Sequence, residues 1–257
     1  MIGVREMDIE FCRRDADDRE AARRPAWLYN EMKPCGVNYN SPTLARSYDT
    51  THGQFRDYRQ EAEEIVARLQ LDDSATVIDM GCGTGAFALH TAAHCARVYA
   101  VDVSKAMLRH ARRKAHKAGI DNIEFHHGGF LTYDHGAEPV DAISSIAVLH
   151  HLPDFWKLVG LRRLASMLKP GGRLFLFDVV FSFGIAEYER RIDRFIRETR
   201  EQMGPGGRNE SETHIREEYS TCDWIMEGLL ERAGFRVETA DYRNDFLAAY
   251  LCTSKGR

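Results

Sequence analysis

The stretch Ala75–Ala86, ATVIDMGCGTGA, constrains the fold of this chain more than any other. A short apolar, β-branched run carries an acid near its end, Asp79, and three glycines follow at alternate positions, Gly81, Gly83 and Gly85. The residues after them are typical of the start of a helix. A buried strand, a glycine-rich turn and a helix N-terminus together form a ligand-binding device, because glycine permits positive φ and lets backbone N–H groups approach a ligand.

The carboxylate beside this turn indicates the charge of the ligand. Asp79 would repel a phosphate and attract a cation, so a sulfonium compound with an α-amino group suits it better than a pyrophosphate does. The next apolar run ends in Asp102, where a carboxylate can hold two ribose hydroxyls. A dinucleotide remains an alternative, because Gly81-x-Gly83-x-x-Ala86 also satisfies the dinucleotide fingerprint and NAD needs the same second acid.

Four stretches at matching spacing resemble the class I S-adenosylmethionine-dependent methyltransferases: Val77–Gly85, Val101–Ser104, Asp141–Leu152 and Leu168–Leu174. The resemblance covers roughly residues 55–255. It implies S-adenosyl-L-methionine as cofactor and an α/β, Rossmann-like, doubly wound fold. The expected sheet has seven strands and is mostly parallel, with a C-terminal antiparallel hairpin.

Alternating strand and helix patterns from residue 75 onward independently favour a parallel sheet with helices on both faces. Strands are predicted near 75–80, 97–102, 123–127, 140–146 and 173–180, with the hairpin at 235–242 and 246–254. Helices are predicted at 41–49, 55–71, 104–118, 155–168, 185–203 and 224–232. The glycine-rich run Gly204–Glu210 is predicted to be a flexible connector.

The chain is predicted to contain an N-terminal arm and lid, residues 1–54, and a methyltransferase domain, residues 55–257. Residues 5–24 are densely charged and indicate a solvated arm. Pro25–Tyr39 mixes aromatic residues, methionine and proline, which is typical of a lid over a cleft or of a segment that covers a sheet edge. A helical insertion at about 182–222, on the acceptor side, completes the prediction.

Composition excludes several classes of function. The net charge of −4 over 257 residues gives no reason to expect a nucleic-acid partner. The six cysteines form no C-x-x-C pair, and no metal-ligand spacing occurs, so no metal site is predicted. No apolar run is long enough to span a membrane, and the charged N-terminus is unlike a signal peptide. These features predict a cytoplasmic protein, and they leave the oligomeric state open between monomer and homodimer.

The resemblance also implies which residues bind the cofactor. Asp79 is expected to reach its ammonium group, and Asp102 its ribose hydroxyls. Met107 and Phe130 are expected against the adenine, although Met107 equally suits the core. The full set of predicted cofactor-binding residues is Tyr48, Asp79, Gly81, Gly83, Thr84, Gly85, Asp102, Val103, Met107, Gly129, Phe130, Ser145 and Ile146.

One position departs from the family pattern. Many relatives carry an acid where Gly129 stands, and that acid receives the adenine amino group. Without it, adenine recognition is expected to depend on backbone groups and on the ring of Phe130.

Four residues are predicted to act on the acceptor: His150, His151, Asp178 and Tyr219. Imidazole moves protons near neutral pH, and His150-His151 follows the fourth strand at the sheet edge where α/β proteins bind ligands. The paired histidines also suit packing or a hydrogen bond, and Asp178 suits a buried hydrogen bond. The polar run His214–Tyr219 suits either a surface loop or the binding of a small polar acceptor.

These features predict an S-adenosylmethionine-dependent methyltransferase that acts on a small-molecule nucleophile by in-line displacement. A protein or RNA methyltransferase is one alternative. An NAD-dependent oxidoreductase and a protein that binds the cofactor without turnover are the others. Ser144–Ala147 stands where an Asn-Pro-Pro-Tyr-like tetrad would indicate methylation of adenine amino groups, which disfavours that substrate. The acceptor atom stays open among oxygen, nitrogen, carbon and sulfur.

Overall fold

The computed structural model describes residues 25–54 and 56–256. It divides into two units, Met1–Asn30 and Glu31–Arg257, which are described separately. In the first unit, the described residues 25–30 include a turn in which Leu28 N donates to Pro25 O at 3.0 Å. The charged arm predicted at 5–24 lies outside the described residues.

The second unit is built on one sheet with the strand order β3-β2-β1-β4-β5-β8-β7, and a further strand, β6, pairs with β5 off this path. The strands are β1 (Thr76–Met80), β2 (Arg97–Asp102), β3 (Ile123–His127), β4 (Val140–Ile146), β5 (Leu168–Phe181), β6 (Thr221–Cys222), β7 (Phe235–Arg243) and β8 (Leu247–Ser254). Strands β1 to β5 pair in parallel, and β8 is antiparallel to both of its neighbours. The predicted seven-stranded arrangement is confirmed, and two-residue β6 is an addition too short to leave a pattern.

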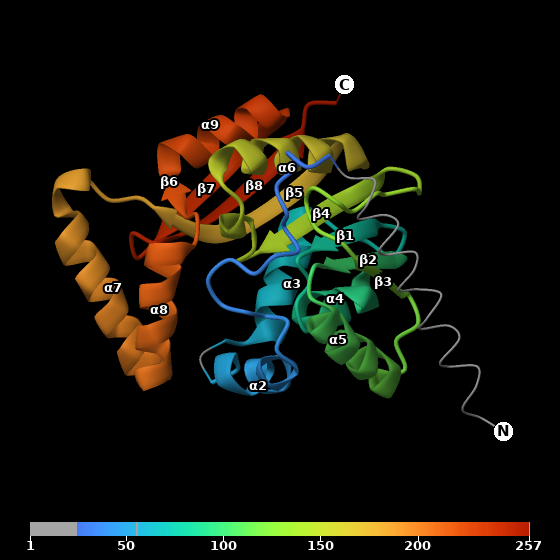
Figure 1. Cartoon of the computed structure of the whole chain (residues 1–257). Helices are drawn as coiled ribbons and strands as arrows, with labels where there is room; N and C mark the ends of the chain where they lie inside the picture. The colour runs from blue at the N-terminus through green and yellow to red at the C-terminus, as the bar shows by residue number, and fades with distance from the viewer. Residues whose placement is uncertain (1–24, 55, 257) are drawn as a thin grey trace. The chain divides into compact units, whose positions relative to one another are not determined.

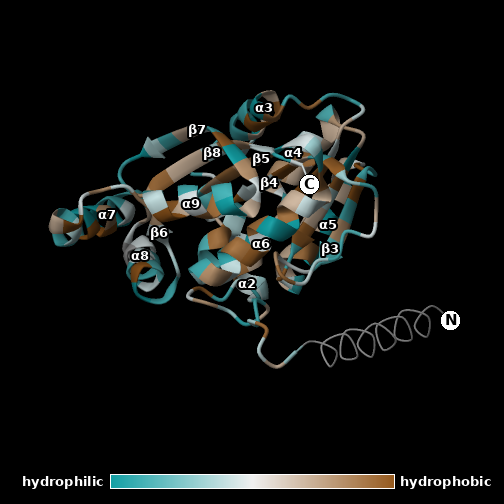
Figure 2. Cartoon of the chain, turned by 90° about the horizontal axis from the view of Figure 1, so that it is seen from above, coloured by the Kyte–Doolittle hydropathy of each residue, from teal (hydrophilic) through white to brown (hydrophobic). Residues whose placement is uncertain are grey.

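Helices cover both faces of the sheet (Figure 1). They are α2 (Pro42–His52), α3 (Tyr58–Leu69), α4 (Ala86–Thr91), α5 (Lys105–Ala118), α6 (Asp154–Met167), α7 (Tyr188–Met203), α8 (Pro205–Glu217) and α9 (Asp223–Ala233), with 3₁₀ turns η1 (Ala92–His94), η2 (Leu149–His151) and η3 (Ile185–Glu187). Helices α3, α4 and α5 pack on one face through a core that includes Ile65, Phe87 and Leu108. Helices α6 and α9 lie side by side over the other face (Figure 2). No helix among the described residues is both long and apolar enough to cross a lipid bilayer.

The chain order around β1 determines where a ligand can bind. From β1 the chain continues to β2 on one side, and it later returns to β4 on the other side. Helices therefore diverge from this point, and a crevice opens at the carboxyl ends of β1 and β4. The glycine turn and the paired histidines follow these two strands.

The predicted connector at Gly204–Glu210 is wrong, because α8 runs through it. Proline is well placed at the start of a helix, where its missing N–H is not needed, and Pro205 begins α8. Gly207 lies so close to α7 that a Cβ there would stand 2.7 Å from Thr199 O. The glycine therefore permits the two helices to approach each other, which its composition alone does not reveal.

The hairpin of α7 and α8 is anchored on the turn between β7 and β8. Arg191 Nη1 lies 2.6 Å from Asp245 Oδ2, and Arg194 binds the same carboxylate. The Phe195 ring stacks on buried Phe246 with centroids 4.4 Å apart. This attachment positions the last turn of α8 beside η2, and so brings Glu218 to the histidines.

Candidate active site

The glycine turn after β1 holds its shape through positive φ angles and close contacts. Gly81 has φ +81°, and a Cβ there would lie 2.3 Å from Val148 Cγ2. Gly83 has φ +52°, and a Cβ there would enter open space. Gly81 N and Cys82 N both donate to Val101 O, at 2.8 and 2.9 Å. The turn is thus fixed from behind, while the space above Gly83 is free for a ligand.

Two neighbouring cavities open along this turn. Both are lined by Tyr48, Gly81, Gly83 and Ile146. The first extends from Asp102 toward Phe130 and His151. The second extends to Asp79 and Thr84. An elongated ligand that crosses Gly83 would occupy both cavities.

The carboxyl group of Asp79 is 2% exposed and lies in the wall of the second cavity. Its Oδ1 accepts from Ser144 Oγ at 3.0 Å, whereas Oδ2 has no hydrogen-bond partner among the described residues. Burial raises the pKa of Asp79 to about 7. A buried carboxylate oxygen without a donor is costly, and a cationic ligand would satisfy it.

Asp102 joins the glycine turn to the helix that follows β2. Its Oδ2 accepts from Gly83 N at 2.8 Å and its Oδ1 from Ser104 N at 2.7 Å. Burial raises the pKa of Asp102 to about 6. Each oxygen has a second lone pair, so this carboxylate can also accept from two ligand hydroxyls.

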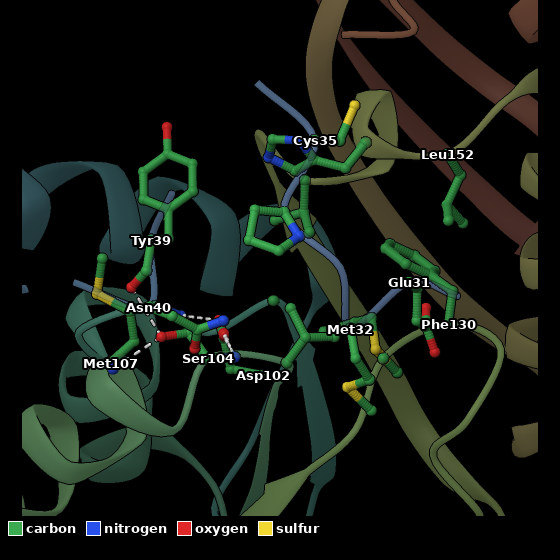
Figure 3. A pocket seen from close by; sticks show the side chains of 18 of the residues that line it. Glu31, Met32, Cys35, Tyr39, Asn40, Asp102, Ser104, Met107, Phe130 and Leu152 are labelled. Atoms are coloured by element: carbon green, nitrogen blue, oxygen red, sulfur yellow. Dashed lines mark hydrogen bonds between the residues drawn. The ribbon is translucent and has the colours of Figure 1, made fainter. Parts of the chain in front are cut away.

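The segment Glu31–Asn40, here called the covering segment, supplies one wall of the first cavity (Figure 3). It is held at three points. Ser104 Oγ donates to Tyr39 O at 2.8 Å, Cys35 Sγ to Glu217 O at 3.0 Å, and Val37 N to Glu218 Oε1 at 3.3 Å. Part of the predicted lid thus lies over the cleft.

Glu31 supplies a carboxylate beside Gly129. Its Oε1 accepts from Leu131 N at 2.9 Å and from Thr132 Oγ1 at 2.6 Å. A Cβ on Gly129 would stand 2.5 Å from Glu31 Oε2. Figure 3 shows Glu31 next to Phe130, across the pocket from Asp102. Sequence reasoning missed Glu31, since nothing in its local pattern relates it to a residue about one hundred positions later.

The paired histidines differ in charge. His150 Nδ1 lies 2.5 Å from Asp178 Oδ1, and Nε2 lies 3.3 Å from Glu218 Oε2. Ionised carboxylates only accept, so both ring nitrogens of His150 donate and the ring is an imidazolium. Burial opposes this charge, but Asp178 and Glu218 outweigh it and raise the pKa of His150 to about 9. Burial, with the neighbouring His150 cation, lowers the pKa of His151 to about 3, so His151 is neutral.

The structure brings most of the predicted site residues together. The first cavity is lined by Tyr48, Gly81, Gly83, Asp102, Val103, Met107, Gly129, Phe130, Ile146 and His151, and the second adds Asp79 and Thr84.

The remaining five predicted residues do not line either cavity: Gly85, Ser145, His150, Asp178 and Tyr219. Gly85 begins α4, and Ser145 is buried in β4. The Tyr219 side chain is 42% exposed. The Tyr219 backbone instead connects η2 with α6. Its N–H donates to the carbonyl oxygen of His150 in η2 at 2.8 Å, and its carbonyl oxygen accepts from Nζ of Lys157 in α6.

Comparison with known proteins agrees with this geometry. Residues 77–172 match the family model described as a methyltransferase domain. The 27-O-demethylrifamycin SV methyltransferase of Amycolatopsis mediterranei (strain S699) is 26% identical over 218 residues, which cover 74% of this chain and 79% of that protein. The S-adenosyl-L-methionine-dependent Diels-Alderase iccD of Talaromyces variabilis is 29% identical over 242 residues, 89% of this chain and 79% of the other.

Solved structures show the same fold. The [4+2]-cyclase SpnF superposes with a TM-score of 0.64 over 87% of this chain and 98% of its own, at 15% identity. The sheet order, the glycine turn with its two acids and these matches lead to one assignment. The family model, the relatives and the shared fold together support the class I S-adenosylmethionine-dependent methyltransferase superfamily for this chain.

Proposed function

We propose that this chain transfers the methyl group of S-adenosyl-L-methionine to a small-molecule acceptor bound beneath the covering segment. One observation carries the proposal: the first cavity continues from Asp102, past the glycine turn, to His151. The far end is bounded by Cys35, Val37 and Leu152. A cavity roofed by its own chain suits a small molecule better than a protein or RNA surface.

The residues around the two cavities fit the cofactor. Asp79 Oδ2, buried and without a donor, suits the α-ammonium group. Asp102 suits the ribose hydroxyls, and Glu31 suits the adenine amino group in place of the acid absent at Gly129. When bound, the cofactor supplies an electrophilic methyl group on a sulfonium.

The covering segment has two tasks in this proposal. It excludes water from the acceptor end of the cavity, and it contributes Glu31 to the cofactor end. Both tasks are performed by ten consecutive residues, so cofactor binding and acceptor enclosure are coupled. An acceptor held against the methyl group needs little more than correct position, because in-line displacement depends chiefly on proximity and orientation.

His151 contributes to positioning rather than to proton removal. A neutral imidazole with a pKa of about 3 is a weak base near pH 7, but it donates and accepts hydrogen bonds. Its ring lies edge-on to Tyr39 of the covering segment, with centroids 5.9 Å apart. We propose that His151 holds a polar atom of the acceptor.

A second candidate is cyclisation of a bound substrate without methyl transfer. The similarity to a protein named as a Diels-Alderase, which spans 89% of this chain, favours it. A weakly basic site suits a reaction that moves no proton. The two candidates differ in one product, because only methyl transfer releases S-adenosylhomocysteine.

A two-stage experiment tests the proposal. Thermal shift with S-adenosylhomocysteine and with NAD identifies the cofactor class, and stabilisation by NAD alone would overturn the assignment. A screen of small hydroxy, amino, thiol and carbon nucleophiles with S-adenosylmethionine then detects S-adenosylhomocysteine release. Release with a small molecule supports methyl transfer. Release only with protein or RNA, or substrate conversion without release, contradicts it.

A further inference from the structure

Three metal-binding side chains meet at the acceptor end of the cavity. His150 and His151 come from η2, and Glu218 follows the last turn of α8. One ligand atom from each lies within 4.8 Å of the other two. The His150 and Glu218 side chains are only 6% and 3% exposed, while His151 lines the cavity itself. The group is therefore buried on one side and open to the acceptor on the other.

Two of the three side chains are held in position by a further side chain. Asp178 binds His150 Nδ1 at 2.5 Å and leaves Nε2 directed toward Glu218. A carboxylate behind a histidine is the usual support of a metal-ligating imidazole, because it fixes the ring and its tautomer. His214 Nδ1 binds the Glu218 carboxylate, and His214 Nε2 lies 2.7 Å from Ser220 Oγ. The orientation of these ligands is thus set before any ion arrives.

Charge also favours a cation here. Asp178 and Glu218 place two carboxylates directly beside the histidine rings. A divalent ion with neutral imidazole ligands would balance both carboxylates. The ion would displace the proton that His150 Nε2 shares with Glu218, and that proton would pass to solvent.

We propose that His150, His151 and Glu218 bind one divalent transition-metal ion, whose open positions accept an oxygen or nitrogen atom of the acceptor. Two imidazoles and a carboxylate suit zinc, iron, cobalt or nickel, whereas magnesium and calcium prefer all-oxygen sites. This inference rests on the proposed function, since it assigns the ion to the acceptor end of the same cavity. It also restricts the acceptor to a molecule with a metal-binding group beside its nucleophile.

The site explains how a weakly basic pocket can activate a nucleophile. A hydroxyl coordinated to a divalent ion loses its proton far more readily than a free one. The O–H bond of the acceptor breaks with its proton leaving to water, and the oxygen is then free to form its bond to the methyl group as the carbon–sulfur bond breaks. His151 in this arrangement binds the ion and not the proton.

Metal binding is tested on the full, untagged chain after dialysis against a chelator. Calorimetric titration with Zn²⁺ and visible absorption with Co²⁺ are expected to give one ion per chain. Glu218→Gln and His151→Ala should each weaken binding at least tenfold. Asp178→Asn should weaken it about tenfold to a hundredfold, as expected for a supporting carboxylate. His116→Ala, at an exposed histidine of α5, serves as the control and should bind as the wild type does.

Thermal shift with S-adenosylhomocysteine, run on every variant, separates this inference from the proposed function. Variants that lose the ion but keep cofactor stabilisation are folded, and they support the metal site. Cofactor binding without a stoichiometric ion, or an ion that Glu218→Gln binds as tightly as the wild type, overturns the metal site alone. Ion binding without cofactor binding overturns the proposed function and leaves the metal site standing.

Discussion

Glu31 occupies the space that a side chain on Gly129 would need, with Oε2 only 2.5 Å from the position of a Cβ at that glycine. A carboxylate from the covering segment therefore stands beside the loop that follows β3. Because Leu131 N and Thr132 Oγ1 both donate to Glu31, the carboxylate is fixed against the loop that follows β3. The absence of a side chain at Gly129 thus leaves room for the Glu31 carboxylate.

We predict that Glu31→Gln weakens the binding of S-adenosylhomocysteine about tenfold to a hundredfold, since a charge-assisted hydrogen bond is worth about 1.5–3 kcal/mol. Isothermal calorimetry measures the change. S-inosyl-homocysteine, which carries an acceptor oxygen in place of the amino donor, is the matched ligand and should lose no affinity in the variant. An equal loss for both ligands would show that Glu31 acts only on the structure.

Gly129→Asp tests whether a carboxylate at position 129 can take the place of the Glu31 carboxylate. In the single variant, where Glu31 is present, the new Cβ would stand 2.5 Å from Glu31 Oε2 and 2.8 Å from Val103 Cγ1. We therefore expect loss of stability and of cofactor binding. In combination with Glu31→Ala the collision with Glu31 is removed and only the contact with Val103 Cγ1 remains, so the double variant should bind S-adenosylhomocysteine more tightly than either single variant. Strictly additive losses of affinity in this double-mutant cycle would show that the carboxylate at position 129 does not take the place of Glu31.

Cofactor affinity should rise with pH because of Asp79. Its pKa is raised to about 7 by burial, so below pH 7 the unliganded protein holds a proton that must leave before the carboxylate meets an ammonium group. We predict up to a tenfold gain in affinity for S-adenosylhomocysteine per pH unit from 6 to 7, and a plateau above pH 7.5. Asp79→Asn should bind more weakly above pH 7 and should lose this slope.

The same group should destabilise the unliganded fold at high pH. The pKa of Asp79 in the folded chain lies above its ordinary value of 3.8, so between these two values the unfolded chain binds fewer protons than the folded chain. This contribution to stability therefore falls as pH rises toward 7. Asp79→Asn should therefore raise the thermal midpoint of the unliganded protein at pH 8. An unchanged or lower midpoint would contradict the buried, partnerless state of Oδ2.

His151→Ala should lower the turnover number at least tenfold and leave the affinity for S-adenosylhomocysteine unchanged, because His151 borders the acceptor and not the cofactor. Steady-state kinetics with an acceptor found by the screen checks this. An NMR titration of the metal-free protein between pH 5 and 9 should show a neutral His151 ring throughout, since the pKa of His151 is about 3. A His151 ring that gains its proton near pH 6 would return His151 to the role of general base.

Two lysines offer a matched test of stability. Lys157 is fully buried and donates to Asp154 at 2.7 Å and to Tyr219 O, whereas Lys169 is 49% exposed and pairs with Asp141 at 2.6 Å. Lys157→Met should reduce the free energy of unfolding by about 1–3 kcal/mol, since Tyr219 O and Asp154 both lose a donor. Lys169→Met should cost less than about 1 kcal/mol. Chemical denaturation distinguishes the two, and equal costs would contradict the assigned burial.

The parallel strands could be predicted because each is a short apolar run bounded by turns, and Asp79 and Asp102 were found because each stands at the carboxyl end of one. Other features have no local signal. Helix α8 could not be predicted, because a glycine such as Gly207 is usually typical of a loop, whereas here it permits close contact between α8 and α7. Glu31 and Glu218 act on residues about 100 and 70 positions away, and only the folded sheet edge brings them there. The group of His150, His151 and Glu218 has no local spacing pattern for the same reason.

The most direct test is a crystal structure of the chain with S-adenosylhomocysteine. We predict that the ligand lies across Gly83, with its amino group within about 3 Å of Asp79 Oδ2, its ribose hydroxyls on Asp102 and its adenine amino group on Glu31 Oε2. An adenine that is recognised without Glu31, or a ligand whose amino group lies away from Asp79, would contradict it.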